Sequence, residues 1–248
     1  MPDAGAAWSQ RRDTVPLPLQ VDGLCYRVDE ETLIDNISVS IDSPGISVIL
    51  GPNGAGKSLF LRLIHGLIDP SAGDIRWRGR PPDLAQRRRQ ALVFQKPVLL
   101  RRSVAANIDF VLKPLGAGYR ERRDQILQAA GLFRLRDHPA RLLSGGEQQK
   151  LALARALATD PAVLLLDEPC ASIDAGSTLQ IETLLEQTSA RGVKILLVTH
   201  NIGQARRLAD DVLFLHHGRL LEYSPAEAFM KCPKSPPAQA FIDGNIVL

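Results

Sequence analysis

The feature that most constrains this chain is the segment GPNGAGKS at residues 51–58, which fits the pattern G-x-x-x-x-G-K-[ST]. It follows GISVILG (45–51), typical of a buried strand, and opens KSLFLRLIHGL (57–67), typical of an apolar helix. Glycines let backbone N–H groups and a helix N-terminus wrap closely around phosphates. The expected site consists of Gly51, Pro52, Asn53, Gly54, Ala55, Gly56, Lys57 and Ser58. Lys57 would reach the β- and γ-phosphates, and Ser58 would bind Mg²⁺ through its hydroxyl.

A second segment, AVLLLDEP (162–169), supplies the acidic half of such a site. A carboxylate at the end of a core strand beside the phosphate loop can hold Mg²⁺, and here that residue is Asp167. Glu168 is one residue further on and is free to orient or deprotonate an attacking water. Together the two segments indicate a P-loop NTPase, a class that also includes kinases, GTPases and helicases.

Between them lies LSGGE (143–147), followed by a strong helical pattern. A helix that begins in this way presents a second anion-binding turn on the same chain. One active site does not need two such turns, whereas two chains stacked head to tail would cover each phosphate loop with the other chain's LSGGE. The second turn comprises Leu143, Ser144, Gly145, Gly146 and Glu147. It argues against an ordinary P-loop kinase and predicts a homodimer that binds a nucleotide at its interface.

The order of elements predicts an α/β fold. Strand patterns precede residue 95, residues 103–158 carry helical patterns, and strands alternate with helices after residue 160. Such alternation indicates a mostly parallel sheet covered by helices. Three short strands are expected before residue 42, Ser103 is a candidate helix cap, and a hairpin is expected to turn at His217–Gly218.

Composition excludes several classes of protein. With 30 basic and 27 acidic residues, the net charge of +3 is too balanced for a general nucleic-acid binder. The three cysteines form no CxxC pair, which argues against a structural zinc site or a disulfide framework. No apolar stretch approaches the roughly 20 residues of a membrane helix, and the first residues lack a signal-peptide pattern. We expect a soluble, intracellular protein that reaches a membrane only through a partner.

With these motifs in order, the chain resembles the nucleotide-binding subunits of ATP-binding cassette (ABC) transporters over nearly all of residues 17–248. The resemblance implies a P-loop NTPase (RecA-like) core with a mixed β-sheet, an N-terminal antiparallel β region and an inserted α-helical subdomain that carries LSGGE, the family signature. The implied core covers 15–95 and 160–231, the helical subdomain 96–159 and a C-terminal extension 232–248. Residues 1–14 would form a flexible arm.

The same resemblance assigns roles to residues outside the two phosphate-site motifs. Tyr26 corresponds to the aromatic residue that stacks on adenine, and Gln95 to the glutamine that touches Mg²⁺ and relays to the permease. Asp174 matches the aspartate of the D-loop, and His200 the switch histidine that contacts the γ-phosphate. Glu168, His200, Gln95 and Lys57 would then be catalytic, with Ser58, Gln95 and Asp167 at the metal. The chain departs from the usual T-S-A-L-D by having CASID at 170–174, where Cys170 is interpreted as a packing residue.

The family resemblance also implies partners: an integral-membrane permease, a solute-binding protein that acts indirectly, and a position at the cytoplasmic face of the membrane. Residues 94–108 resemble the tungstate importers, while the segment from 168 to 185 and the stretch after 198 resemble the phosphate importers. The expected cargo is therefore an oxyanion, tungstate first, then phosphate, molybdate or another anion, with polar amino acids last.

Two other classes of ABC protein fit less well. DNA-repair ATPases carry a long coiled coil between the two nucleotide-binding motifs, and translation-type proteins carry two cassettes on one chain. An exporter would normally carry its own membrane helices.

Residues 76–102 hold nine basic side chains against one aspartate. This segment is either a solvated basic face or a contact for anionic lipid headgroups or acidic permease loops.

Overall fold

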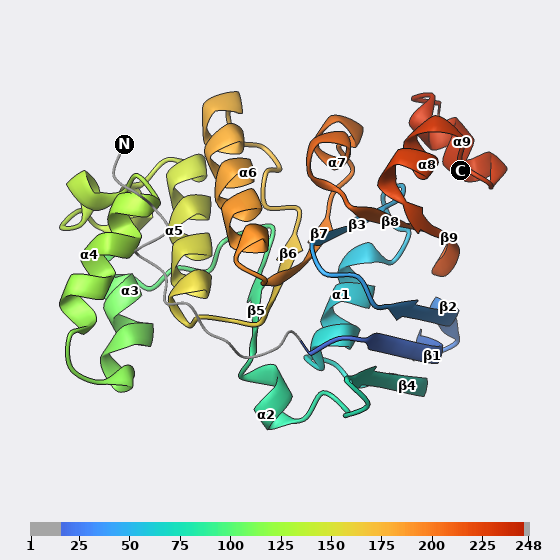
Figure 1. Cartoon of the computed structure of the whole chain (residues 1–248), viewed down its shortest axis with the longest axis horizontal. Helices are drawn as coiled ribbons and strands as arrows, with labels where there is room; N and C mark the ends of the chain where they lie inside the picture. Colours follow the sequence, from blue (N-terminus) through green and yellow to red (C-terminus); the bar gives the residue numbers. More distant parts are fainter. Residues whose placement is uncertain (1–15, 246–248) are drawn as a thin grey trace.

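The structure is a computed structural model that describes residues 16–245. The arm expected at residues 1–14 lies outside this part of the chain. The described chain folds around a six-stranded sheet of order β5-β6-β7-β3-β8-β9 and a smaller three-stranded sheet of order β2-β1-β4 (Figure 1).

The six-stranded sheet is mixed, as expected. Its strands are β3 (Ile46–Leu50), β5 (Gln90–Val93), β6 (Val163–Asp167), β7 (Lys194–Val198), β8 (Asp211–His216) and β9 (Arg219–Pro225). Neighbours are parallel from β5 to β8, and β9 is antiparallel to β8. Strands β3, β6 and β7 are buried on both faces, which explains their continuous aliphatic sequences. The β8–β9 hairpin turns at His217 and Gly218, both with positive φ, as the sequence predicts.

The small antiparallel sheet corrects one expectation. The segments LPLQV and LCYRV are not separate strands, because β1 runs continuously from Leu19 to Val28. It pairs with β2 (Glu31–Ile41) on one side and β4 (Ala72–Trp77) on the other, with register shifts near residues 22–27. The polar residues Asp22 and Gly23, which suggest a turn in the sequence, sit at this irregularity in the strand.

Most helices lie where the sequence predicts them, and three short ones at 84–87, 226–231 and 236–242 are additional. The helices are α1 (Lys57–His65), α2 (Leu84–Arg87), α3 (Val104–Leu112), α4 (Tyr119–Ala129), α5 (Gly145–Ala158), α6 (Ala175–Ala190), α7 (Ile202–Leu208), α8 (Ala226–Lys231) and α9 (Pro236–Ile242), with short 3₁₀ turns η2 (Lys113–Leu115), η3 (Phe133–Leu135) and η4 (Ala140–Leu142). The expected helical insert is confirmed, since α3, α4 and α5 gather at one end of the molecule (Figure 1). Ser103 caps α3 by accepting a hydrogen bond from the N–H of Ala106, as predicted.

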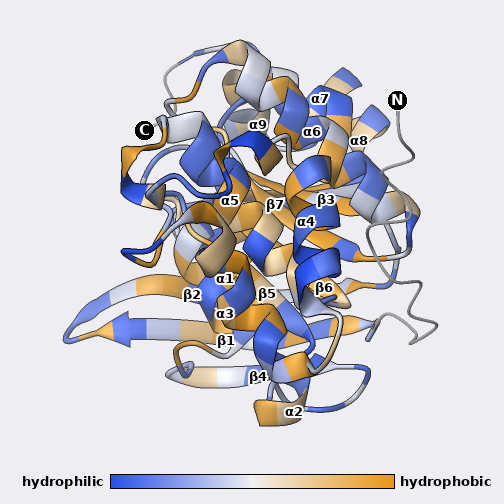
Figure 2. Cartoon of the chain, turned by 90° about the vertical axis from the view of Figure 1, so that its left-hand side faces the viewer, coloured by the Kyte–Doolittle hydropathy of each residue, from blue (hydrophilic) through white to orange (hydrophobic). Residues whose placement is uncertain are grey.

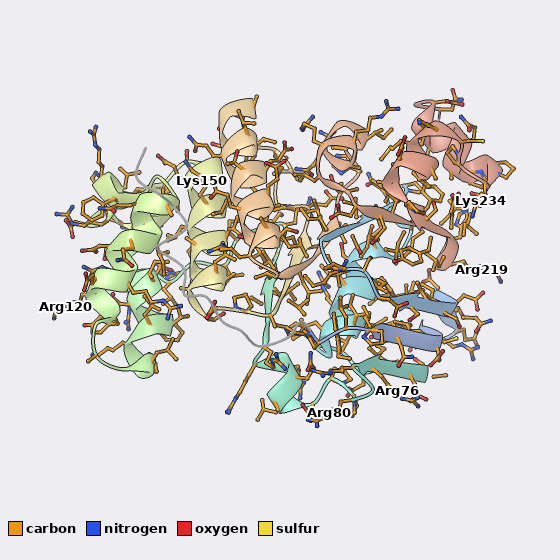
Figure 3. The ribbon with its side chains drawn as sticks, in the orientation of Figure 1. Arg76, Arg80, Arg120, Lys150, Arg219 and Lys234 are labelled. Carbon is orange, nitrogen blue, oxygen red and sulfur yellow. The ribbon has the colours of Figure 1, made fainter. Side chains whose placement is uncertain are left out.

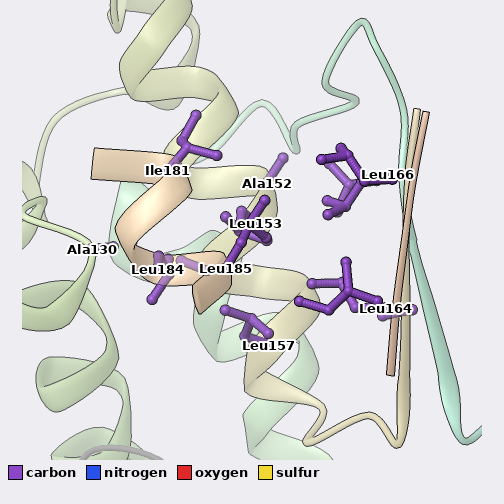
Figure 4. Packing of buried hydrophobic residues seen from close by; sticks show 14 of the residues in the cluster. Ala130, Ala152, Leu153, Leu157, Leu164, Leu166, Ile181, Leu184 and Leu185 are labelled. Atoms are coloured by element: carbon purple, nitrogen blue, oxygen red, sulfur yellow. The ribbon is translucent and has the colours of Figure 1, made fainter. Parts of the chain in front are cut away.

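Two apolar clusters cover opposite faces of the large sheet. On one face, α1 packs between the two sheets through Phe60, Leu61 and Ile64. On the other, α5 and α6 pack Leu153, Leu157, Ile181, Leu184 and Leu185 against Leu164 and Leu166 (Figure 4). The apolar strands lie inside the molecule and hydrophilic residues face outward on the helices (Figure 2). Within the described residues no helix is long and apolar enough to cross a membrane.

The last described helices, α8 and α9, dock on the sheet through aromatic rings. The ring of Phe214 on β8 lies 5.9 Å from that of Phe229 on α8 and 5.5 Å from that of Phe241 on α9, centroid to centroid. Ala238 on α9 is fully buried. The C-terminal helices therefore extend the core.

Candidate active site

The phosphate loop, residues 51–58, links β3 to α1, and its backbone has positive φ at three glycines. Gly51 has φ 147°, and a Cβ there would stand 2.1 Å from the carbonyl oxygen of Leu215. Gly56 has φ 91° and is the N-cap of α1, but it has no side chain to cap the first turn. The first N–H groups of α1 therefore lack a side-chain acceptor at the N-cap, which suits an anion.

Lys57 is held inside this loop. Its ammonium donates to the carbonyl oxygens of Gly51, at 2.9 Å, and Pro52, at 2.8 Å. Burial lowers the pKa of Lys57, while the carboxylates of Glu168 and Asp167 raise it. The side chain is thus positioned at the phosphate loop, facing the two acidic residues that end β6.

Asp167 ends β6 directly beside the phosphate loop. Its Oδ1 accepts a hydrogen bond of 2.6 Å from the Ser58 hydroxyl, and only 5% of the residue is exposed. Burial raises the pKa of this carboxyl, an effect opposed by the hydrogen bond from Ser58. A buried carboxylate and a hydroxyl are hard oxygen donors, the kind that Mg²⁺ prefers. The residues present therefore fit a magnesium ion.

Glu168 lies at the edge of the sheet where the carboxyl ends of three neighbouring strands meet. Gln95 Nε2 donates to Glu168 Oε2 at 3.3 Å, and His200 Nδ1 lies 3.1 Å from the same oxygen. Gln95 follows β5, Glu168 follows β6 and His200 follows β7, and the carboxyl ends of parallel strands share one edge. These residues line one end of a cavity of about 690 Å³. A glutamate at this edge, with a histidine at hydrogen-bonding distance, can take a proton from a water.

The signature segment, residues 143–147, lies in the helical insert rather than at this edge. Ser144 caps α5 through a complete capping box: its hydroxyl accepts from the Glu147 N–H, and its own N–H donates to Glu147 Oε2 at 2.8 Å. Gly146 faces α6, where an added Cβ would stand 2.3 Å from Ser177 Oγ. Within one chain, the start of α5 therefore packs on the D-loop helix.

A model of the family described as "ABC transporter" matches residues 34–171. The chain belongs to the ABC transporter family. The tungstate uptake system ATP-binding protein TupC of Peptoclostridium acidaminophilum is 41% identical over 196 residues, covering 77% of this chain and 91% of that protein. The phosphate import ATP-binding protein PstB of Thermotoga maritima is 35% identical over 248 residues, covering 92% of this chain and 98% of that protein. The chain is accordingly an ABC-type ATPase that binds ATP.

Solved structures agree with this assignment. CbiO1 of Clostridium perfringens, described as part of the ABC transporter complex cbiONQ, superposes with a TM-score of 0.77 at 29% identity. The match covers 90% of this chain and 93% of that one. The fold expected from the sequence, a P-loop core with an antiparallel β region and an inserted helical subdomain, is therefore confirmed.

Two further residues were singled out from the sequence, Asp174 and Tyr26. Asp174 is the N-cap of α6, and hydrogen bonds from Ser177 lower the pKa of its carboxyl. Tyr26 on β1 pairs with Ile34, whose side chain borders the phosphate loop at Gly56. Tyr26 is partly buried.

Sequence reasoning missed two supports of the site. The N–H of Gly218 in the β8–β9 turn donates to the carbonyl of Ala55, so this hydrogen bond ties the hairpin to the phosphate loop. The buried carboxylate of Glu182 lines the same cavity as Glu168 and His200. The only sequence signal for Glu182 is its place beside Ile181 and Leu185 on the apolar side of α6.

Part of the basic segment 76–102 makes contacts within the chain. Arg76 pairs with Asp74 at 3.2 Å, and Arg87 donates to the carbonyl oxygen of Gly66 at 2.8 Å. Arg76 and Arg80 extend from the outer edge of the small sheet (Figure 3).

Proposed function

We propose that this chain is the ATP-hydrolysing subunit of an importer for an oxyanion, with tungstate as the first candidate. The observation that carries the proposal is the similarity to the tungstate uptake protein TupC, at 41% identity over 196 residues. It agrees with the resemblance of residues 94–108, the segment after Gln95, to tungstate importers.

Phosphate is the second candidate. Several relatives named for phosphate import, including those of Thermotoga maritima and Bacillus subtilis, match 92% of the chain, a larger share than the tungstate relative does. Molybdate or another anion follows, and a polar amino acid comes last.

A membrane permease would dock beside the segment after Gln95. Val98 is 68% exposed and Phe110 is 58% exposed, although both are apolar. Val98 lines a cavity of about 230 Å³ between β5, α3 and α5, and so does Val111, the residue after Phe110 on α3. Apolar side chains exposed around a hollow are typical of an interaction surface. The chain would thus lie on the cytoplasmic face of the membrane without entering it, and a solute-binding protein would act through the permease.

The catalytic unit would be a homodimer. Two copies would each place the signature segment 143–147 over the partner's phosphate loop, with ATP between them. Tyr26 would stack on adenine, and Asp174 would lie at the dimer interface. Closure of the dimer would move the Gln95 segment and, through it, the permease.

Hydrolysis would use the residues gathered at Glu168. Glu168 would accept a proton from the attacking water, while Lys57 and His200 stabilise the charge on the γ-phosphate. Ser58, Gln95 and Asp167 would hold Mg²⁺, which neutralises charge on the phosphate oxygens when bound.

The cargo is tested by calorimetry on the solute-binding protein encoded beside this gene. We would titrate that protein with tungstate, molybdate, sulfate and phosphate. Tight tungstate binding with weak phosphate binding supports the first candidate. Binding of phosphate alone would favour the second candidate. The resemblance of residues 94–108 would then reflect how the chain docks on its permease and not which anion is transported.

The dimer and the base are tested by Glu168→Gln. The amide cannot accept the proton of water, so hydrolysis should fall at least about tenfold while ATP binding persists, and a stable dimer should appear in size-exclusion chromatography with ATP. Glu186→Gln, the same change at an exposed position, is the control. Normal hydrolysis by Glu168→Gln would show that the base is another residue.

A further inference from the structure

A buried carboxylate joins the two helices that follow the D-loop and the switch histidine. Glu182 on α6 is 4% exposed. Its Oε2 accepts from Arg207 Nε at 2.8 Å, and its Oε1 accepts from Arg207 Nη2 at 2.7 Å and from Gln204 Nε2 at 3.2 Å. Both partners belong to α7. We call Glu182, Gln204 and Arg207 the Glu182 clamp.

The clamp connects elements that carry the chemistry. Helix α6 begins after its N-cap Asp174, and α7 begins after its N-cap Asn201, which directly follows His200. The thiol of Cys170, two residues after Glu168, also interacts with the Gln204 side chain. The clamp therefore joins the segments that hold Glu168, Asp174 and His200.

The position of the His200 ring must be supported by contacts other than those of its own side chain. Its side chain is 56% exposed, so packing alone does not fix the ring that lies 3.1 Å from Glu168. Helix α7 has only seven residues, and a helix of that length is marginal without tertiary contacts. The position of the ring depends on how α7 is anchored.

Stability alone does not account for the clamp. Burying a carboxylate is costly, and an apolar pair of similar volume often stabilises a fold as well or better. A bidentate arginine–carboxylate pair, by contrast, sets both distance and orientation. The side chain of Arg207 is 52% exposed, whereas that of Glu182 is buried. The pair therefore sets the orientation of α7 from the buried side of the helix.

We propose that Glu182 is a positioning residue for ATP hydrolysis, which acts with Gln204 and Arg207 to hold His200 in place against Glu168. The proposal rests on the roles given to Glu168 and His200 in the proposed function. It concerns the hydrolytic step and does not depend on the cargo.

The first test is kinetic. Glu182→Gln, and the neutral pair Glu182→Gln with Arg207→Gln, which leaves no unpaired buried charge, should each lower kcat by about tenfold or more, since small misplacements of catalytic groups have effects of that order. The KM for ATP should stay within about twofold, because the phosphate loop is untouched. Glu186→Gln and Arg206→Gln, exposed neighbours on the same helices, are the matched controls and should retain wild-type kcat. An unchanged kcat in both clamp variants would overturn the proposal.

The second test uses NMR to observe the imidazole ring of His200 directly. The chain has five histidines, so the imidazole signals of ¹⁵N-histidine-labelled protein are few, and His200→Ala identifies the one from His200. In Glu182→Gln this signal should move while the other four stay in place. If the His200 signal does not move, or if all five move together, the clamp does not position this ring. A His200→Ala variant with wild-type kcat would instead refute the catalytic role of His200, independently of the clamp.

Discussion

Helix α1 begins at Gly56, which has no side chain to cap it, whereas α5 begins at Ser144, which caps it completely with Glu147. The two turns are both rich in glycine and both present backbone N–H groups at a helix start. The phosphate loop leaves those groups without a side-chain partner at the cap and keeps a buried lysine beside them. In the signature segment, by contrast, side chains of the same chain bind N–H groups at the helix start through the capping box of Ser144 and Glu147. In the proposed homodimer, the first turn would bind the phosphates of ATP within its own chain, and the second would meet the ATP held by the partner.

The largest effect should come from the phosphate loop. Lys57→Ala removes the charge that faces the phosphates and the bonds to Gly51 and Pro52. We expect the Kd for ATP to rise at least about tenfold, the range of one or two hydrogen bonds to a charged group, and hydrolysis to fall below detection. Binding of fluorescent ATP by the monomer measures the Kd, and Lys231→Ala, at an exposed side chain of α8, is the control. Wild-type affinity for ATP in Lys57→Ala would show that the phosphate loop does not bind the nucleotide through this lysine.

Ser144→Arg should separate the two turns. A large cation at the signature segment blocks a partner's nucleotide but leaves the chain's own phosphate loop intact. Hydrolysis should therefore be lost while the Kd of the monomer for ATP stays within about twofold. Ser40→Arg, at an exposed position on β2, serves as the control for the bulk and charge of arginine. Loss of ATP binding by the monomer would mean that segment 143–147 acts within its own chain.

The smallest effect concerns the cap itself. Ser144→Ala removes the hydroxyl that accepts from the Glu147 N–H, so the free energy of unfolding should fall by about 1 kcal/mol. Urea unfolding without nucleotide measures this loss, with Ser40→Ala as the comparison outside any helix cap. An unchanged midpoint would show that Glu147 and water replace the cap.

Local sequence was sufficient for the parts of this protein that local physics controls. The helix start at Ser103 and the hairpin at His217–Gly218 were both predictable. Each depends on a capping hydroxyl or on a residue that tolerates positive φ, and neither requires a distant partner. The phosphate loop belongs to this group because its glycines and lysine are contiguous.

Tertiary structure decided what depends on distant segments. The continuity of β1 across Asp22 and Gly23 arises because two neighbouring strands pair with it on either side, which overrides a local turn preference. The contact of Gln95 and His200 with one oxygen of Glu168 follows from the order of β5, β6 and β7 in the sheet. The Glu182 clamp joins residues 22 and 25 positions apart, on two helices whose packing no local pattern specifies. The sequence alone determined the family and its phosphate loop, because those are written in adjacent residues. The geometry that fixes Glu168, His200 and Glu182 came only from the fold, because hydrogen bonds between distant segments exist only once the sheet has set their neighbours.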